Sequence, residues 1–225
     1  MIYGPPQSQK ESTSLLDSFR TIGVELTVRQ LEQFEIYQGR LLAWNARAGL
    51  ISRNDEARIV ERHFLESAAL VNLGFFDCKV NVLDLGTGGG FPGVPIKILR
   101  PEISLTLLDS RRIKTLFLKN LVEKLLLEEI SVVCERAENV NQHADFENKF
   151  GVVLSRAVAD LTKVYRWSRA FIKSGGVLVT IKGSNLKDEE KMFRKRFPLA
   201  SISIITLPSC LGDSAKNQRI VCVTE

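Results

Sequence analysis

The chain has 225 residues, of which 44% are hydrophobic and 25% are charged, and its formal net charge is +5. This size and composition are typical of one globular catalytic domain with a modest extension, whose core needs neither disulfides nor a metal. No run of 18 apolar residues occurs, which excludes a membrane-spanning segment, and the basic excess (+6 over residues 76–225, −1 over residues 1–75) favours a polyanionic partner such as nucleic acid.

The first 75 residues predict a leader followed by helices. Residues 1–10 lack the apolar stretch of a signal peptide, and we expect them to be a flexible leader. Thr27 and Gln30 have the spacing of a capping box, and apolar residues then recur at helical intervals up to Gly49. We therefore expect a long helix here, within an N-terminal helical region over residues 11–75.

A second helix should follow, with Asn54 as its cap and Gly74 at its end. From residue 80 onward, short apolar runs alternate with amphipathic segments. The predicted strands are residues 80–84, 103–109, 130–134, 151–155, 176–181, 201–207 and 219–224. The predicted helices are residues 93–100, 111–124, 160–172 and 185–196.

This alternation predicts the fold class. Strands that alternate with helices form a parallel sheet with helices on both faces, and the last two strands, which no helix separates, should pair antiparallel. The expected fold is therefore α/β, with a doubly wound, mainly parallel seven-stranded sheet that ends in a C-terminal antiparallel hairpin. This Rossmann-like arrangement, expected over residues 76–225, is usual for class I methyltransferases that use S-adenosylmethionine.

A glycine-rich loop follows the first predicted strand, with five glycines between Gly86 and Gly93. Ligands of parallel sheets bind at the carboxyl ends of the strands, and glycines let a ligand approach the backbone closely. No Lys-Ser or Lys-Thr follows these glycines, which excludes a phosphate-binding P-loop. The spacing of Gly88, Gly90 and Gly93 also fits a dinucleotide fingerprint, so this pattern alone leaves NAD open.

Two carboxylates favour a methyl donor over a dinucleotide. Asp84 precedes the glycines, where it would repel a pyrophosphate but suit the sulfonium and ammonium groups of S-adenosylmethionine. Asp109 ends the second predicted strand, where it can accept hydrogen bonds from two ribose hydroxyls. We expect Asp84, Gly86, Gly88 and Asp109 to bind S-adenosylmethionine, with NAD binding or a purely structural glycine turn as the alternatives.

An ordered set of short motifs carries a family resemblance. The motifs are LAWN at 42–45, RH at 62–63, VLDLGTGGGFPGVP at 82–95, LLDS at 107–110, SRA at 155–157, IKG at 181–183 and RIV at 219–221. With them, residues 30–225 resemble the glucose-inhibited division protein B family of bacteria, which methylates guanine N7 in small-subunit ribosomal RNA. The resemblance implies that Gly86 and Phe91 line the methyl-donor site, that Ala137 and Glu138 hold its adenine end, and that Arg156 lies beside both ligands.

The implied chemistry needs few catalytic groups. Guanine N7 has a lone pair and no proton at neutral pH, so it can attack the methyl group without a general base once the reactants are aligned. We expect Arg156 and Lys182, at the ends of the fourth and fifth strands, to orient the guanine through O6, with a structural ion pair as the alternative for Arg156. The four cysteines lack metal or redox spacing and predict neither a metal site nor a cysteine nucleophile.

The resemblance also implies an RNA partner, either 16S ribosomal RNA or the small ribosomal subunit, with a target guanine in the 530-loop region. The residues expected to contact RNA are Asn45, Arg62, His63, Arg136 and Arg219. For His63, a purely structural role within its helix is the alternative. We expect a cytoplasmic monomer that binds no membrane and no metal. Two other functions are left open: a non-catalytic ribosome-assembly factor that binds RNA, and an NAD-binding oxidoreductase.

Overall fold

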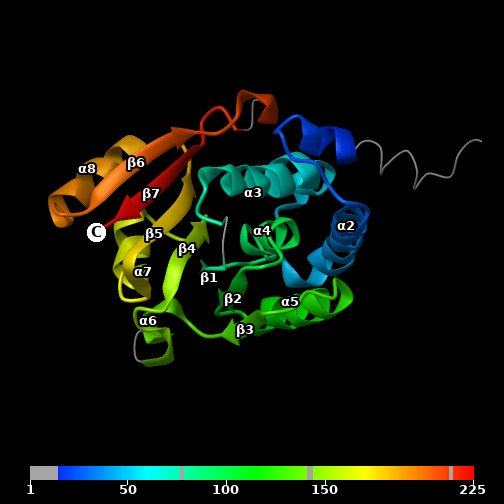
Figure 1. Ribbon diagram of the computed structural model, residues 1–225, viewed down its shortest axis with the longest axis horizontal. Coiled ribbons are helices and arrows are strands. Elements are labelled where there is room, and N and C mark those ends of the chain that lie inside the picture. Colours follow the sequence, from blue (N-terminus) through cyan, green and yellow to red (C-terminus); the bar gives the residue numbers. More distant parts are fainter. Residues whose placement is uncertain (1–14, 77–78, 141–143, 213–214) are drawn as a thin grey trace, which may run out of the picture.

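The computed structural model of the protein describes residues 15–76, 79–140, 144–212 and 215–225. In this part of the chain seven strands form one sheet, in the order β3-β2-β1-β4-β5-β7-β6 (Figure 1). The leader predicted at residues 1–10 lies outside the described residues, as does Cys78.

The sheet is mainly parallel, and its strands are β1 (Asn81–Leu85), β2 (Ser104–Asp109), β3 (Ile130–Cys134), β4 (Phe150–Arg156), β5 (Ile172–Lys182), β6 (Ser201–Thr206) and β7 (Arg219–Thr224). Strands β1 to β5 run parallel, while β7 pairs antiparallel with both β5 and β6. The predicted doubly wound sheet with a C-terminal antiparallel hairpin is thus confirmed. The strand order reverses between β1 and β4, which is where ligands of such sheets bind.

The helices lie on both faces of the sheet and are α2 (Val28–Ala48), α3 (Glu66–Ala68), α4 (Gly93–Leu99), α5 (Arg112–Lys124), α6 (Ala137–Val140), α7 (Leu161–Ser168) and α8 (Leu186–Arg196). The helix predicted over 160–172 ends early, because Ile172 already belongs to β5 and pairs with Phe150 of β4. Asp160 is its cap and accepts a hydrogen bond from the Lys163 backbone. None of the described helices is long and apolar enough to cross a membrane.

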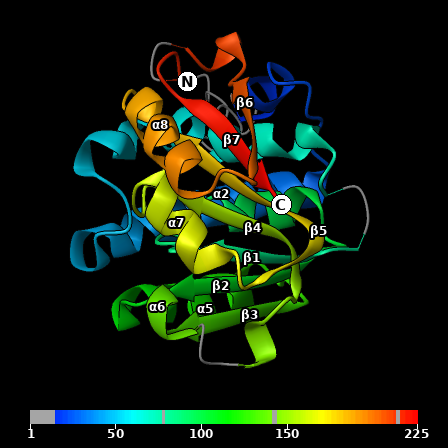
Figure 2. The ribbon, with the colours of Figure 1, turned by 90° about the vertical axis from the view of Figure 1, so that its left-hand side faces the viewer.

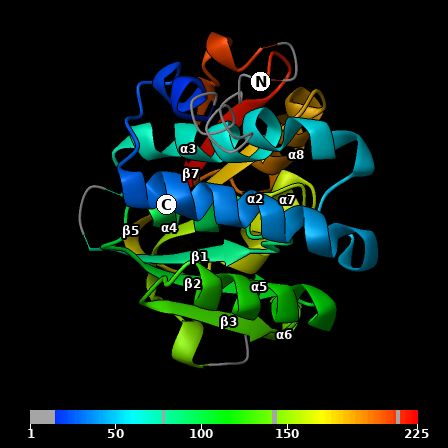
Figure 3. The same ribbon diagram turned by 90° about the vertical axis from the view of Figure 1, so that its right-hand side faces the viewer.

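The alternation of side chains along the central strands divides the core into two parts. Leu83 and Leu85 of β1 pack in a cluster with residues of α7 and α8, whereas Val82 belongs to a cluster with residues of α2, α4 and α5. Figure 2 shows α7 and α8 in front of one face of the sheet, and Figure 3 shows α2 and α5 in front of the other. The N-terminal helices therefore share one hydrophobic core with the sheet.

Helix α2 forms as the sequence predicts and holds the glycine-rich loop in place. The side chains and backbones of Thr27 and Gln30 bond reciprocally in a capping box, and Gly49 ends the helix in the left-handed conformation. From the buried face of α2, the Tyr37 hydroxyl donates to the Gly89 carbonyl at 2.7 Å, and Gln33 Nε2 donates to the Leu125 carbonyl at 2.7 Å. The loop after β1 is thus fixed from the N-terminal region.

The second predicted helix is irregular. Asn54 is not its cap: a 3₁₀ turn begins at Arg53 after Ser52, and the Asp55 backbone N–H bonds to the Ser52 carbonyl at 3.0 Å. A π-helical segment, Val60–Leu65, follows and leads into α3. Gly74 ends the region with a φ of 75°, as predicted. Consecutive residues from 63 to 71 are buried, which an ideal amphipathic α-helix does not allow, and π-helical segments of this kind often occur at functional sites.

The glycine-rich loop closes on the carboxylate of Asp84. Asp84 is fully buried, and its Oδ2 accepts hydrogen bonds from the Thr87 hydroxyl at 2.6 Å and the Gly93 backbone N–H at 2.9 Å. Burial raises the pKa of Asp84 to about 6, against the opposing effect of these two hydrogen bonds. A Cβ atom at Gly93 would lie 2.7 Å from the same oxygen. Gly93 is therefore required for packing on Asp84.

We predict that Gly93→Ala lowers the free energy of unfolding by about 3 kcal/mol, because the new methyl group meets Asp84 and disrupts the bond to its buried carboxylate. Gly39→Ala is the matched control, since Gly39 is exposed in the interior of α2 with open space around it. That control should gain about 0.5–1 kcal/mol from helix propensity. Urea denaturation of both variants measures the effect, and wild-type stability of Gly93→Ala would contradict the packing role.

Candidate active site

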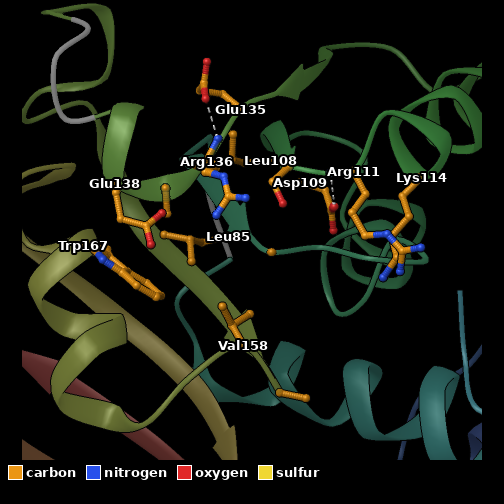
Figure 4. Close-up of a pocket in the computed structure, with 14 residues that line it drawn as sticks. Leu85, Leu108, Asp109, Arg111, Lys114, Glu135, Arg136, Glu138, Val158 and Trp167 are labelled. Atoms are coloured by element: carbon orange, nitrogen blue, oxygen red, sulfur yellow. Dashed lines mark hydrogen bonds between the residues drawn. The ribbon is translucent and has the colours of Figure 1, made fainter. Parts of the chain in front are cut away.

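A cavity of about 290 Å³ lies at the carboxyl ends of β1 to β4. It is lined from the loop after β1 by Gly86, from the end of β2 by Asp109, from the start of α6 by Ala137 and Glu138, and from the loop after β4 by Val158. Figure 4 shows Glu138 and Trp167 on one side of it, and Asp109, Arg111 and Lys114 on the other. We call it the first cavity. It occupies the point where the strand order reverses.

The Asp109 carboxylate in this cavity is held in a fixed orientation. Its Oδ2 accepts the Gly88 backbone N–H at 3.0 Å, and its Oδ1 accepts the Arg111 backbone N–H at 2.8 Å. A carboxylate has about four lone-pair sites, so each oxygen can still accept one further hydrogen bond. Asp109 is thus oriented by the backbone while it lines the cavity, and it suits two neighbouring hydroxyl groups.

Close packing explains the glycine at the centre of the first cavity. Gly86 has a φ of 73°, and a Cβ atom there would lie 2.4 Å from Cγ2 of Val158. The absent side chain lets the loops after β1 and β4 approach each other. The cavity wall also contains apolar groups of Leu85, Ala137 and Trp167. The apolar wall suits the adenine base of S-adenosylmethionine, and the Asp109 carboxylate suits its ribose hydroxyls.

A second cavity of about 380 Å³ adjoins the first, and both are lined by Ala157. The second cavity is lined mostly by charged and polar side chains. They are Asp55, Arg62, His63 and Glu66 of the N-terminal region, Arg156 of β4, Lys182 of β5, Glu189 of α8 and Gln218 before β7. Ala157 itself has a φ of 54°, which is uncommon for a residue other than glycine. The chain therefore turns sharply at the point that the two cavities share.

The guanidinium of Arg156 is the centre of the second cavity. Its Nη2 lies 2.5 Å from His63 Nδ1, its Nη1 donates to the Arg62 carbonyl at 2.9 Å, and the same Nη1 is 3.4 Å from Glu66 Oε2. Its central carbon lies 5.1 Å from the ring centroid of Phe91. Burial lowers the pKa of Arg156, and the Glu66 carboxylate opposes this most strongly. Because arginine remains protonated in proteins, the group acts here as a buried cation.

His63 is held neutral beside this cation. Its ring stacks on Phe91 with 4.7 Å between the ring centroids. Burial, followed by the positive charge of Arg156, lowers the pKa of His63 to about 3. Since Nδ1 accepts a hydrogen bond from Arg156, the single proton of the neutral ring must lie on Nε2. His63 is therefore neither a cation that could bind phosphate nor a free general base.

Glu66 and Lys182 complete the charge balance of the second cavity. Burial raises the pKa of Glu66 to about 7, while Arg156 and then Arg62 lower it. The Lys182 ammonium donates to the Ala159 carbonyl at 2.5 Å and lies 3.0 Å from Glu189 Oε2. Two of its three protons are thus used within the protein. In the described part of the chain, no three His, Cys, Asp or Glu side chains are placed to hold a metal ion.

Several residues predicted for the donor site lie elsewhere. Gly86, Asp109, Ala137 and Glu138 line the first cavity, and their contact with the donor stays a prediction. Gly88 acts through its backbone bond to Asp109. Asp84 does not line the cavity, because its carboxylate is buried beneath the loop. Phe91 is also outside that lining. Its ring stacks on His63 and lies against the Arg156 guanidinium, and its contact with the donor stays a prediction.

The residues expected to contact RNA are separated by the structure. Asn45 is buried, and its amide is used within the protein: Oδ1 accepts the Leu50 and Ile51 backbone N–H groups, and Nδ2 donates to Glu56. Its role is therefore to fix the end of α2. Arg62 and His63 line the second cavity and Arg136 lines the first. Arg219 lines neither cavity and bonds to the carbonyls of Lys216 and Gln218.

The sequence did not predict a role for four residues that complete the second cavity. They are Asp55, Glu66, Glu189 and Gln218. Glu66 lies within the segment that carries the family resemblance, so its place after the Arg62-His63 pair was a usable signal. Glu189 and Gln218 come from a charged helix and a loop with no motif, and only the folded chain brings them to the site.

Comparison with known proteins finds relatives over most of the chain. The family model for rRNA small subunit methyltransferase G matches residues 30–221. A protein named ribosomal RNA small subunit methyltransferase G from Roseiflexus castenholzii is 39% identical over 180 residues, which cover 80% of this chain and 76% of that protein. One of the same name from Lachnoclostridium phytofermentans is 33% identical over 180 residues, covering 80% and 74%.

Solved structures with little sequence similarity share the fold. Fibrillarin from Aeropyrum pernix, in complex with natively bound S-adenosyl-L-methionine, superimposes with a TM-score of 0.55 at 15% identity, over 73% of this chain and 75% of that one. Precorrin-6y C5,15-methyltransferase from Geobacter metallireducens gives a TM-score of 0.54 at 14% identity, over 71% and 87%. At this identity the likeness concerns the fold alone.

We predict that His63 does not titrate between pH 8 and pH 5, because burial and Arg156 hold its pKa near 3, against about 6.5 for a free imidazole. The chain has two histidines, so His143→Asn leaves His63 as the only imidazole for an NMR titration. A ring-proton shift with a midpoint near pH 6.5 would contradict the buried contact with Arg156. Because the pKa of His63 is lower in the folded chain than in the unfolded chain, the neutral ring stabilises the folded state above pH 6.5. This contribution to stability is lost as pH falls toward 3.

Proposed function

This chain belongs to the family of rRNA small subunit methyltransferase G, and from that membership and the two adjoining cavities we propose that it methylates N7 of one guanine in the 530 loop of 16S ribosomal RNA. It is an S-adenosylmethionine-dependent methyltransferase. The structural observation that supports the proposal is that Ala157 lines both cavities, so that the cavity suited to the donor adjoins the one suited to a base.

The first cavity supports binding of the donor through this chain's own residues. Asp109, oriented by two backbone N–H groups, accepts hydrogen bonds from the ribose hydroxyls. Ala137 and Glu138 lie where the adenine end is expected, and Gly86 lets the loop after β1 pack against Val158 at the cavity wall. When bound, S-adenosylmethionine supplies a methyl group on a positively charged sulfur.

The second cavity supports a ring nitrogen as the methyl acceptor. Guanine N7 has no proton to lose, so the site needs to align the base and exclude water rather than remove a proton. The second cavity has no need of a general base, and His63 does not act as one, because the ring is neutral and its Nδ1 already accepts a hydrogen bond from Arg156. The guanine gains positive charge as N7 is methylated, and the carboxylates of Asp55 and Glu66 in the cavity stabilise that charge.

The family membership sets aside the two other functions considered from the sequence. A dinucleotide oxidoreductase and a non-catalytic assembly factor both conflict with membership in a methyltransferase family that covers residues 30–221. We propose that the RNA reaches the site across basic side chains at the two cavities, namely Arg62, Arg111, Lys114 and Arg136. The expected monomeric state and cytoplasmic location remain predictions.

The proposed function is tested by incubating the protein and methyl-labelled S-adenosylmethionine with small ribosomal subunits that lack the modification. We expect label in one nucleotide of the 530 loop, and N7-methylguanosine on mass spectrometry after digestion. Reduction and aniline cleavage, which break RNA at N7-methylguanosine, locate the position. Label at another atom, or in another region of the RNA, would refute the target assignment.

Arg156→Lys in the same assay should lower kcat/KM about 100-fold, because lysine cannot contact His63, Glu66 and the Arg62 carbonyl together. Arg169→Ala is the matched control, since Arg169 is half-exposed, pairs with Glu225, and lines neither cavity. It should retain wild-type activity. An Arg156→Lys variant with unchanged kcat/KM would show that the base site does not depend on this guanidinium.

A further inference from the structure

A hydrogen-bond donor and an acceptor lie side by side on two residues that line the second cavity. The donor is Nε2 of His63 and the acceptor is Oδ2 of Asp55, and the two atoms are 3.9 Å apart. That distance is too long for a hydrogen bond between them. Both residues come from the irregular N-terminal segment, where the 3₁₀ turn carries Asp55 and the π-helical segment carries His63.

The His63 donor is buried and has no hydrogen-bond partner among the described residues. Its side chain is only 9% exposed, and Nε2 itself is inaccessible to solvent. Arg156 occupies Nδ1, which fixes the ring proton on Nε2. Buried polar groups in proteins nearly always have a partner, so an unpartnered donor on a residue of the cavity wall points to a ligand atom that accepts its hydrogen bond.

Asp55 supplies the acceptor beside this donor. Its Oδ1 lies 3.1 Å from a nitrogen of Arg58 and 3.7 Å from Nε of Arg62. Oδ2 accepts one hydrogen bond, from the Ser52 hydroxyl at 3.1 Å, and a carboxylate oxygen has room for a second. Two residues of the cavity wall therefore carry one donor and one acceptor, 3.9 Å apart, whose hydrogen-bonding capacity is not used up within the described residues.

This pair matches one edge of guanine and opposes the same edge of adenine. Guanine has the acceptor O6 next to the donor N1–H, whereas adenine has the donor N6–H₂ next to the acceptor N1. Resting on the proposed function, we propose that His63 Nε2–H binds O6 and Asp55 Oδ2 binds N1–H of the target nucleotide, so that these two residues select guanine. Both contacts lie on the far side of O6 from N7, and they leave the N7 lone pair free.

The roles of Arg156 and Lys182 change accordingly. The sequence predicted that these cations bind O6, but Arg156 donates to His63, Glu66 and the Arg62 carbonyl, and Lys182 donates to the Ala159 carbonyl and pairs with Glu189. Arg156 is then a positioning residue, because its bond to Nδ1 determines which nitrogen of His63 carries the proton. The O6 donor is the neutral imidazole.

The test uses RNA in which the mapped target nucleotide is guanosine, inosine or 2-aminopurine. Inosine keeps O6 and N1–H and lacks only the 2-amino group, so kcat/KM should stay within about threefold of guanosine. 2-Aminopurine lacks both O6 and N1–H, and its kcat/KM should fall about 100-fold. Without the donor, the guanosine and inosine RNAs should bind with similar dissociation constants, and the 2-aminopurine RNA should bind more weakly. Equal values for guanosine and 2-aminopurine would overturn the proposal.

Two variants show whether the discrimination comes from these residues. In His63→Leu and in Asp55→Ala, kcat/KM for the guanosine RNA should fall about 10- to 100-fold, while kcat/KM for the 2-aminopurine RNA changes little. The two kcat/KM values should therefore become similar. Glu61→Gln, at an exposed position of the same π-helical segment, is the matched control and should keep the wild-type ratio. Affinity for S-adenosylmethionine verifies that each variant is folded, and Asp55→Ala tests the proposal if His63→Leu does not fold.

The outcomes separate this proposal from the proposed function. If wild-type protein methylates the mapped guanine at an atom other than N7, the proposed target atom is wrong, and the guanosine to 2-aminopurine ratio still reports on base selection. If N7 is methylated but the ratio in His63→Leu and Asp55→Ala equals that of wild type, the assignment of O6 and N1–H to these residues is overturned.

Discussion

The structure depends on how the protein holds one buried positive charge, the guanidinium of Arg156 at the end of β4. A buried charge is costly unless it is paired and hydrogen-bonded, and removing one partner is strongly destabilising. The sheet does not supply those partners. They come from the N-terminal region, which provides the imidazole of His63, the carboxylate of Glu66 and the backbone carbonyl of Arg62. The N-terminal helices are thus part of the site and form one wall of its second cavity.

A second buried charge organises the neighbouring loop in a similar way. Asp84 is enclosed by the glycine-rich loop and bonds to Thr87 and Gly93, so its carboxylate fixes the loop that bounds the first cavity. The glycines of this loop have different tasks. Gly86 permits close approach at the cavity, whereas Gly90 and Gly93 permit packing against Tyr37 and Asp84. A dense glycine motif therefore does not mean that every glycine touches the ligand.

Much of the fold could be predicted because its signals are local. The seven strands follow from apolar runs, the limits of α2 follow from Thr27, Gln30 and Gly49, and the antiparallel hairpin follows from the missing helix between the last two strands. The donor cavity was also within reach, since residues such as Asp109 stand at strand ends that parallel pairing brings to one edge.

The rest could not be predicted, because it depends on contacts between distant segments. Nothing local shows that Asp84 faces Gly93 instead of a ligand, or that the amide of Asn45 is used at the end of α2. The pairing of His63 with Arg156 joins residues 93 positions apart. The π-helical segment that makes this pairing possible has an ordinary helical sequence, and its irregularity is visible only in the folded chain.

The most direct test is a crystal structure of the protein with S-adenosylhomocysteine and an RNA fragment that contains the target guanosine. The central claim is that donor and base occupy the two cavities that meet at Ala157, with the base held in the cavity built around Arg156. The adenosine should then lie against Asp109 in the first cavity, and the guanine in the second, with N7 directed at the sulfur across a gap that one methyl group fills. The account would be contradicted if the guanine bound outside the second cavity while Arg156 and His63 kept their present positions.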